Sequence, residues 1–181
     1  MESLDKLILA VEASVAFAGF AGIIATFQFG EAKKVTRADA VGLTMILQFS
    51  LLAALIASIP LLLHSFGVTT TTMWAVTSAS TAIVYAGAQY SQATELGKAT
   101  FKSKSFPRII RVVRFIGYGV ISINILNFLD VFFHRESGPV ITALIWALAI
   151  TGFSFSRLLL APIWRRVRLQ ETSTPANAIS G

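Results

Sequence analysis

The stretch KATFKSKSFPRIIRVVR, Lys98 to Arg114, decides the fold, because it sets six basic residues between two apolar segments. Those two segments run over 72–92 and 113–133, and three more occupy 7–29, 40–66 and 140–162. Each is near or above the roughly 20 residues that an α-helix needs to cross a bilayer. The sequence therefore predicts an all-α integral membrane protein with five transmembrane helices in one bundle.

The basic residues also predict an orientation. Of the 15 Lys and Arg residues, twelve lie in alternate gaps between the segments or in the C-terminal tail. Only Lys6 and Arg135 fall on the other side, and Arg157 lies inside the last segment. Because Lys and Arg accumulate on the cytoplasmic side of a membrane, we expect the N-terminus outside and the C-terminus inside.

Composition agrees with a membrane location. The chain is 55% hydrophobic and only 13% charged, far from the balance of an average soluble domain. Its net charge of +6 follows the flanks of the apolar segments, and no nucleic-acid motif is present, so no nucleic-acid partner is predicted. The absence of cysteine excludes disulfides and thiolate metal sites.

The first segment resembles a signal peptide in one respect, the sequence Ala16-Phe17-Ala18. Glu2 and Asp5 nevertheless stand against only Lys6 and the amino group, so the preceding region lacks the net positive charge of a signal peptide. We therefore expect this segment to remain as a helix. Residues 1–169 then form the transmembrane domain, and the polar residues 170–181 a disordered tail. Short loops and missing sorting motifs indicate a multi-pass protein of a cytoplasmic (inner) membrane.

The stretch from Phe106 to Ile116 has an amphipathic pattern. On a helical wheel Arg108, Arg111 and Arg114 fall within about 120° of one another, opposite an arc of Ile and Val. One interpretation is an in-plane helix on the inner leaflet, before the fourth span, whose arginines bind anionic lipid head groups. The other is that these arginines are simply the basic flank of the fourth span.

Glu12 is the first candidate for a functional site. It lies about five residues inside the first segment, or roughly 7.5 Å deep at 1.5 Å per residue. A charged group in the membrane costs roughly 2.5–3.5 kcal/mol on insertion scales, so it marks a functional candidate. We expect Glu12 to face the interior of the bundle.

The second candidate is a polar stripe in the fourth segment. Asn124, Asn127, Asp130 and His134 follow the spacing i, i+3, i+6, i+10, which a helix places on one side. Since unpaired amides are costly in hydrocarbon, Asn124 and Asn127 should point inward. Asp130, on the same side of the helix, should point inward with them.

His64 ends the second segment on the same outer side, so Glu12, His64, Asp130 and His134 share one layer. This layer suits a protonatable cluster at the mouth of an ion or proton path. The alternatives are a divalent metal site or a haem between the two histidines. In a further alternative His64, Asp130 and His134 lie at the head groups and simply face water, and Glu12 is paired or hydrogen-bonded to a neighbouring helix. No metal, cofactor or catalytic motif is present, so neither a metal nor a cofactor is predicted, and no enzyme.

Polar and small residues elsewhere favour helix packing. Tyr85, Gln89 and Gln92 share one face of the third segment, with Gln48 at similar depth, and interhelical hydrogen bonds explain them better than a wet path. Small residues recur every four positions in two stripes: Ser14, Ala18, Gly22 and Thr26, and Ser78, Ala82 and Ala86.

Two functions follow from these observations. The first is a small ion-conducting or proton-linked element, assembled as a parallel homo-oligomer because five helices hardly enclose a wide pore. The alternative is a non-catalytic accessory, scaffold or sensor subunit bound to another membrane protein.

Overall fold

The structure is a computed structural model, and it describes residues 2–30, 37–97 and 106–173. These residues form five α-helices and no strand. The bounds of the helices are α1 Glu2–Gly30, α2 Arg37–Ser65, α3 Thr70–Gly97, α4 Phe106–Phe128 and α5 Gly138–Ser173. The helical bundle predicted from the apolar segments is confirmed.

Three of the helices contain a span long and apolar enough to cross a membrane. These spans are Leu4–Thr26 in α1, Gly42–Ser65 in α2 and Gly138–Leu160 in α5. They support the assignment to a membrane. Within the described residues no such span is found in the other two helices, where α3 carries a row of Thr, Ser and Gln residues and α4 begins with an arginine-rich stretch.

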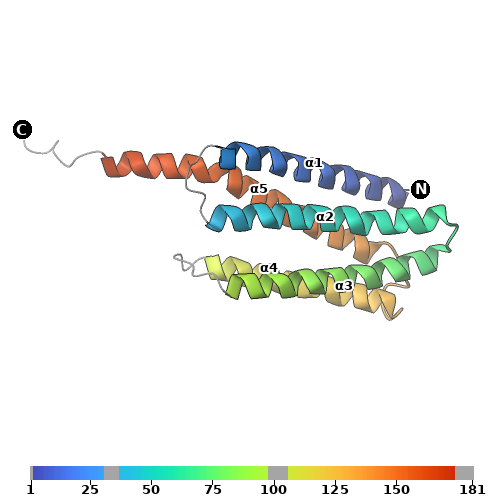
Figure 1. The fold of residues 1–181 in the computed structure, drawn as a ribbon. Helices are drawn as coiled ribbons and strands as arrows, with labels where there is room; N and C mark the ends of the chain where they lie inside the picture. The colour runs from blue at the N-terminus through green and yellow to red at the C-terminus, as the bar shows by residue number, and fades with distance from the viewer. Residues whose placement is uncertain (1, 31–36, 98–105, 174–181) are drawn as a thin grey trace, which may run out of the picture.

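The bundle has two parts (Figure 1). Helices α1, α2 and α5 pack together, while α3 and α4 form a pair that meets the rest through α2 and α5. Within the described ranges α1 packs against α2 and α5 but not against the α3–α4 pair, so it lies at the edge of the bundle. Successive helices run in opposite directions along the bundle.

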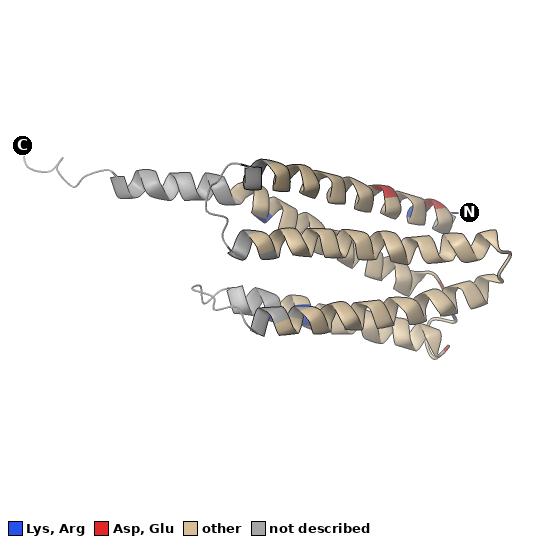
Figure 2. Ribbon diagram, in the orientation of Figure 1, with Lys and Arg blue, Asp and Glu red and all other residues tan. Residues whose placement is uncertain are grey.

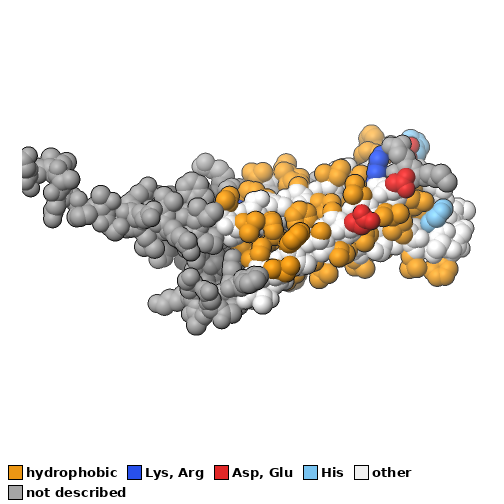
Figure 3. Space-filling model, turned by 90° about the horizontal axis from the view of Figure 1, so that it is seen from above, with side chains coloured by type: hydrophobic (Ala, Val, Ile, Leu, Met, Phe, Trp, Pro, Cys, Tyr) orange, Lys and Arg blue, Asp and Glu red, His pale blue; other side chains and the backbone are white. Residues whose placement is uncertain are grey.

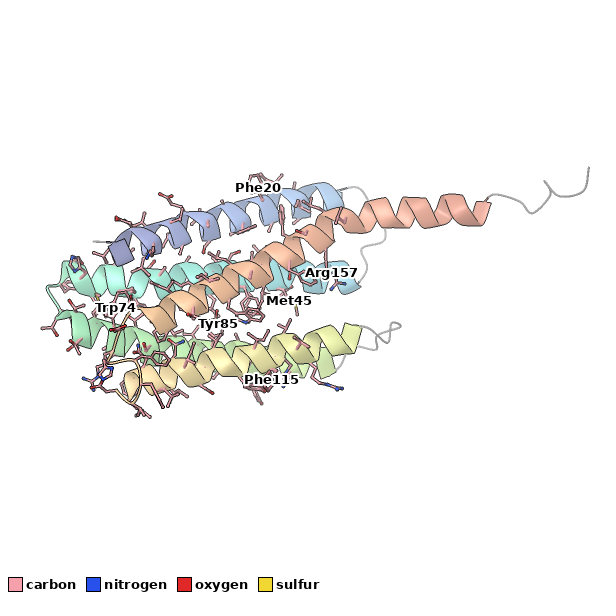
Figure 4. The ribbon with its side chains drawn as sticks, turned by 180° about the vertical axis from the view of Figure 1, so that it is seen from behind. Phe20, Met45, Trp74, Tyr85, Phe115 and Arg157 are labelled. Atoms are coloured by element: carbon pink, nitrogen blue, oxygen red, sulfur yellow. The ribbon has the colours of Figure 1, made fainter. Side chains whose placement is uncertain are left out.

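The core lies where these parts meet. Trp74 and Tyr85 of α3 are buried, and Figure 4 shows them with Met45 of α2 between the helices. Phe20 of α1 and Phe115 of α4 point away from the bundle and are 55% and 79% exposed. Large apolar side chains on the outside of a helical bundle are typical of surfaces that face lipid.

Two short loops lie at one end of the bundle, which we call the hairpin end. They are residues 66–69 between α2 and α3 and residues 129–137 between α4 and α5, and the start of α1 lies at the same end (Figure 1).

The helices α2 and α4 stop at the hairpin end in the same way. After α2, Gly67 N–H donates to His64 O (3.0 Å) and Val68 N–H donates to Leu63 O (3.1 Å), with Gly67 at φ 71°. After α4, Asp130 N–H donates to Asn127 O (3.3 Å) and Val131 N–H to Leu126 O (3.1 Å), with Asp130 at φ 61°. Both ends are Schellman motifs, in which one left-handed residue closes the helix.

This geometry corrects two sequence predictions for α4. The helix ends at Phe128 and not at 133, because Asp130 takes the left-handed conformation, which hydropathy does not reveal. The arginine-rich stretch from Phe106 is the first part of α4 and not a separate helix before it, since the helix continues through Phe128 without a break.

The C-terminal prediction falls only partly within the described residues. Helix α5 continues through Ser173, so the first four residues of the predicted tail 170–181 belong to this helix. Residues 174–181 lie outside the described part of the chain.

Candidate functional site

The residues of the predicted outer layer lie toward the hairpin end, but they do not converge. Glu12 is on α1, His64 is at the end of α2, and Asp130 and His134 are in the loop after α4. All four side chains are exposed. Among the described residues, no group of three or more His, Asp or Glu side chains is placed to hold a metal ion.

The predicted polar stripe is interrupted after Asn127. Asn124 and Asn127 are fully buried, as the helical spacing predicts. The prediction that they carry Asp130 with them is wrong, because the helix has ended and Asp130 instead serves as the left-handed residue of the helix terminus. His134 also has a positive φ, 48°, in the following loop.

Asn127 fastens this loop to the bundle. Its Nδ2 donates to Ser78 Oγ (2.7 Å) on α3 and to Glu136 O (2.9 Å), and its Oδ1 accepts from Glu136 N–H (3.1 Å). The side chain thus joins α3, α4 and the loop to α5 in one buried contact. Its hydrogen-bonding groups are used for structure, which leaves little capacity to bind an ion.

Asn124 makes a similar connection one turn earlier. Its Nδ2 donates to Val120 O (2.9 Å) and to Pro139 O (3.2 Å), which ties α4 to the start of α5. Its Oδ1 is buried and has no hydrogen-bond partner within the described residues.

The polar face of α3 is buried in the same region. The hydroxyls of Thr77 and Thr81 donate to the backbone carbonyls four residues earlier, Met73 O and Thr77 O. Tyr85 donates its hydroxyl hydrogen to Ala143 O, which joins α3 to α5. The bonds of Thr77 and Thr81 stay within α3, whereas the bond of Tyr85 is interhelical, as favoured for Tyr85.

Farther along α3, the amide side chains make weaker contacts. Gln89 Nε2 donates to Arg114 O (3.4 Å) on α4, beside Gly117, where a Cβ would lie 1.7 Å from that nitrogen. Gln48 Nε2 donates to Ser91 Oγ (3.3 Å), so it links α2 to α3. The side chain of Gln92 lies outside the described residues.

The arginines of α4 differ in exposure. Arg111 is exposed, whereas Arg114 is partly buried and its Nη2 donates to Tyr118 Oη (3.2 Å). The side chain of Arg108 is not among those described. The proposed contact with lipid head groups therefore depends on Arg111 and Arg114 within the described chain.

Glu12 has the opposite placement from the one expected. The side of α1 that packs against the bundle contains Leu7, Ala10, Ser14 and Ala21, all buried. Glu12 lies on the other side, about 180° away at 3.6 residues per turn. The expectation that Glu12 faces the bundle is therefore wrong.

An outward face of α1 can be defined around Glu12. At 100° per residue, its exposed members lie within about 60° of one another on the helix: Asp5, Glu12, Ala16, Gly19 and Ile23. Seen from above, acidic side chains lie among hydrophobic ones near the end opposite the C-terminus (Figure 3), and acidic positions mark α1 near its start (Figure 2).

Sequence reasoning missed this face for a physical reason. Both sides of α1 are apolar and both carry small residues, so periodicity alone does not distinguish the packed side from the free one. The predicted stripe of small residues is itself divided, because Ser14 is buried while Gly22 and Thr26 are exposed. The sequence did contain one indication of a special face, the charge of Glu12, because a carboxylate is costly in lipid and needs water or a partner.

No protein-family model, curated protein or solved structure matches the chain.

Proposed function

We propose that this chain is a non-catalytic assembly subunit of a membrane complex and that α1 is the helix by which it binds a neighbour. The observation that carries this proposal is Glu12, a carboxylate exposed at the centre of the outward face of α1. A carboxylate facing only lipid is costly, and intramembrane ionisable residues are generally paired.

The buried polar residues support the same function. Asn127 bridges two helices and a loop, and Tyr85 bridges α3 and α5. The polar groups of the interior thus hold the fold together, while the carboxylate of Glu12 faces outward. This division favours a scaffold with an external binding surface over a protomer with its own internal path.

The proposed topology has five spans with the N-terminus outside, in a cytoplasmic membrane. Even the shortest helix, α4, has 23 residues and is about 34 Å long at 1.5 Å per residue, enough to cross a bilayer. In this orientation Arg111 and Arg114 lie at the inner leaflet, where they attract anionic head groups by roughly 1 kcal/mol per basic residue.

Cysteine labelling tests the topology, since the chain has no native cysteine. A membrane-impermeant thiol reagent should reach position 137 from outside intact cells and a position within 98–104 only after permeabilisation. Labelling of both positions from the same side would contradict five spans.

Photo-crosslinking tests the assembly function. A crosslinking amino acid at position 16 or 19, on the outward face, should give one discrete product with a second protein in native membranes. The same amino acid at position 115, which is exposed on a different helix, is the matched control and should give no such product. Equal results at the two sites would contradict a binding role for α1.

An ion-conducting or proton-linked oligomer is the second candidate. It is favoured by the same placement of Glu12, because a ring of parallel copies joined through α1 would set this carboxylate between subunits. Purified chain in liposomes should then conduct ions or protons, and Glu12→Gln should abolish the flux. For an assembly subunit we expect no flux above that of empty liposomes.

A further inference from the structure

We propose that the outward face of α1 docks a transmembrane helix of a different protein and that this helix presents a Lys or Arg to Glu12. The inference rests on the proposed assembly function and adds the chemistry of the partner. It depends on the depth of Glu12, on the sign of the charges on the face, and on the space beside them.

Glu12 lies well inside the apolar span of α1. Glu12 is the eighth residue after Leu4, where the apolar span of α1 begins, so it lies about 12 Å along that span. The side chain of Glu has only two methylene groups and does not reach from that depth to the head groups. A cationic side chain on an adjacent helix is the group that best compensates an ionised carboxylate there.

Helix α1 does not supply this cation on the same face. Lys6 lies six residues from Glu12, and helix positions interact when they are three or four apart. Asp5, by contrast, lies seven residues from Glu12 and on the same side of the helix. The outward face therefore carries two charges of one sign, spaced by two turns.

Like charges disfavour a second copy of the chain as the occupant of this face. Two parallel copies joined through this face would set Asp5 and Glu12 against their own counterparts, and like charges brought together in this way repel. An antiparallel pair would need both orientations, which the distribution of Lys and Arg disfavours. A helix with basic side chains is complementary to the face in the proposed topology.

Small residues beside Glu12 leave space for a neighbouring helix. Ala16 and Gly19 lie one turn and two turns beyond Glu12 on the outward face, and both are exposed. No heavy atom lies within 4 Å of where a Cβ would stand on Gly19. Small residues let two helices approach closely in lipid, so the partner backbone can come near enough for its cation to meet Glu12.

A designed probe helix tests the inference directly. The probe is a polyleucine transmembrane peptide with a Lys at the depth of Glu12 in each leaflet, so that either orientation presents the cation. It is reconstituted with the full chain in phosphatidylcholine vesicles, and association is measured by energy transfer. We expect the Lys probe to bind about tenfold more tightly than the all-leucine probe, equivalent to about 1.4 kcal/mol.

Variants of the chain make the test specific. Glu12→Gln should remove the preference for the Lys probe, and Glu12→Lys should transfer it to a probe with Glu at the same depth. Asp130→Asn is the matched control, since it removes an exposed carboxylate outside α1 and should leave the preference unchanged.

Two outcomes would overturn the inference. Equal binding of the Lys and all-leucine probes would show that charge does not select the partner. Self-association of labelled copies that is tighter than probe binding, and is lost in Glu12→Gln, would assign the face to a second copy. Either outcome rejects this partner chemistry. If positions 16 and 19 nevertheless give a discrete crosslink, the assembly function still stands.

Discussion

The α3–α4 pair and α1 place their polar residues in opposite ways. In the pair, Asn127 is fully buried and its side chain makes three hydrogen bonds, so its polarity is used to hold the fold together. In α1, Glu12 is exposed on the side away from the bundle. A polar group in a membrane helix needs a partner, which Asn127 has within the bundle and which we propose for Glu12 on a neighbouring protein.

Removal of the hydrogen bonds of Asn127 should have the largest effect on the free energy of unfolding. Asn127→Ala leaves Ser78 and the backbone of Glu136 without their shared partner in a buried site, and we expect a loss of about 2 to 3 kcal/mol in the free energy of unfolding. Unfolding by SDS in detergent micelles, followed by circular dichroism, measures this loss.

Ser122→Ala on the same helix is the control for Asn127. Its hydroxyl is exposed and donates only to Tyr118 O within α4 (2.9 Å), so the variant should stay within about 0.5 kcal/mol of the native chain. Similar losses from both substitutions would mean that Asn127 does not fasten the α3–α4 pair to the loop.

The two Schellman motifs provide the next test, with effects of opposite sign. Gly67→Ala puts a side chain at φ 71° and should destabilise the fold by about 1 to 2 kcal/mol. Asp130→Gly puts a residue without a Cβ at φ 61°, which removes the steric cost of this conformation. The substitution should stabilise the fold by up to about 1 kcal/mol. Thermal denaturation of the two variants in one detergent compares them, and a large loss from Asp130→Gly would restore a role for the Asp130 carboxylate.

Gly117 tests how tightly the pair is packed. A Cβ at this position would lie 1.7 Å from Gln89 Nε2, so Gly117→Ala must displace the end of that buried side chain. We expect a cost of about 1 kcal/mol, because the Gln89 contact to Arg114 O is lost. In a Gln89→Ala background the same substitution should cost clearly less, and equal costs in both backgrounds would contradict the contact.

Glu12 should have the smallest effect on the isolated chain. Because its side chain is exposed, Glu12→Gln should change the free energy of unfolding by no more than about 0.5 kcal/mol. The SDS titration used for Asn127 measures this change. A loss as large as that of Asn127→Ala would mean that Glu12 has an internal partner, and the contrast between the two regions would disappear.

The sequence predicted the parts of the fold that depend on hydropathy. Each of the five apolar segments lies largely on one helix, and Asn124 and Asn127 are buried as their spacing indicates. The end of α4 was not predicted, since Leu129, Val131 and Phe132 continue the apolar pattern although the chain has already left the helix at Asp130. A left-handed residue that is not Gly gives no signal in a hydropathy profile.

The candidate site was less predictable than the fold. Depth can be counted from the end of a segment, and this count brought Glu12, His64 and Asp130 into one layer. The direction in which each side chain points depends on which helices become neighbours. For α1, those neighbours are α2 and α5, which pack on the side away from Glu12.

The rotation of α1 is the central claim, and a spin-label scan of positions 7 to 23 in lipid vesicles tests it most directly. Each position is changed to Cys in turn, and the accessibility of its nitroxide to oxygen is measured. We predict maxima at positions 12, 16, 19 and 23 and minima at 7, 10, 14 and 21, in accord with their exposure and burial. Maxima at 7, 10, 14 and 21 would show that Glu12 faces the bundle, and the proposed binding surface would not exist.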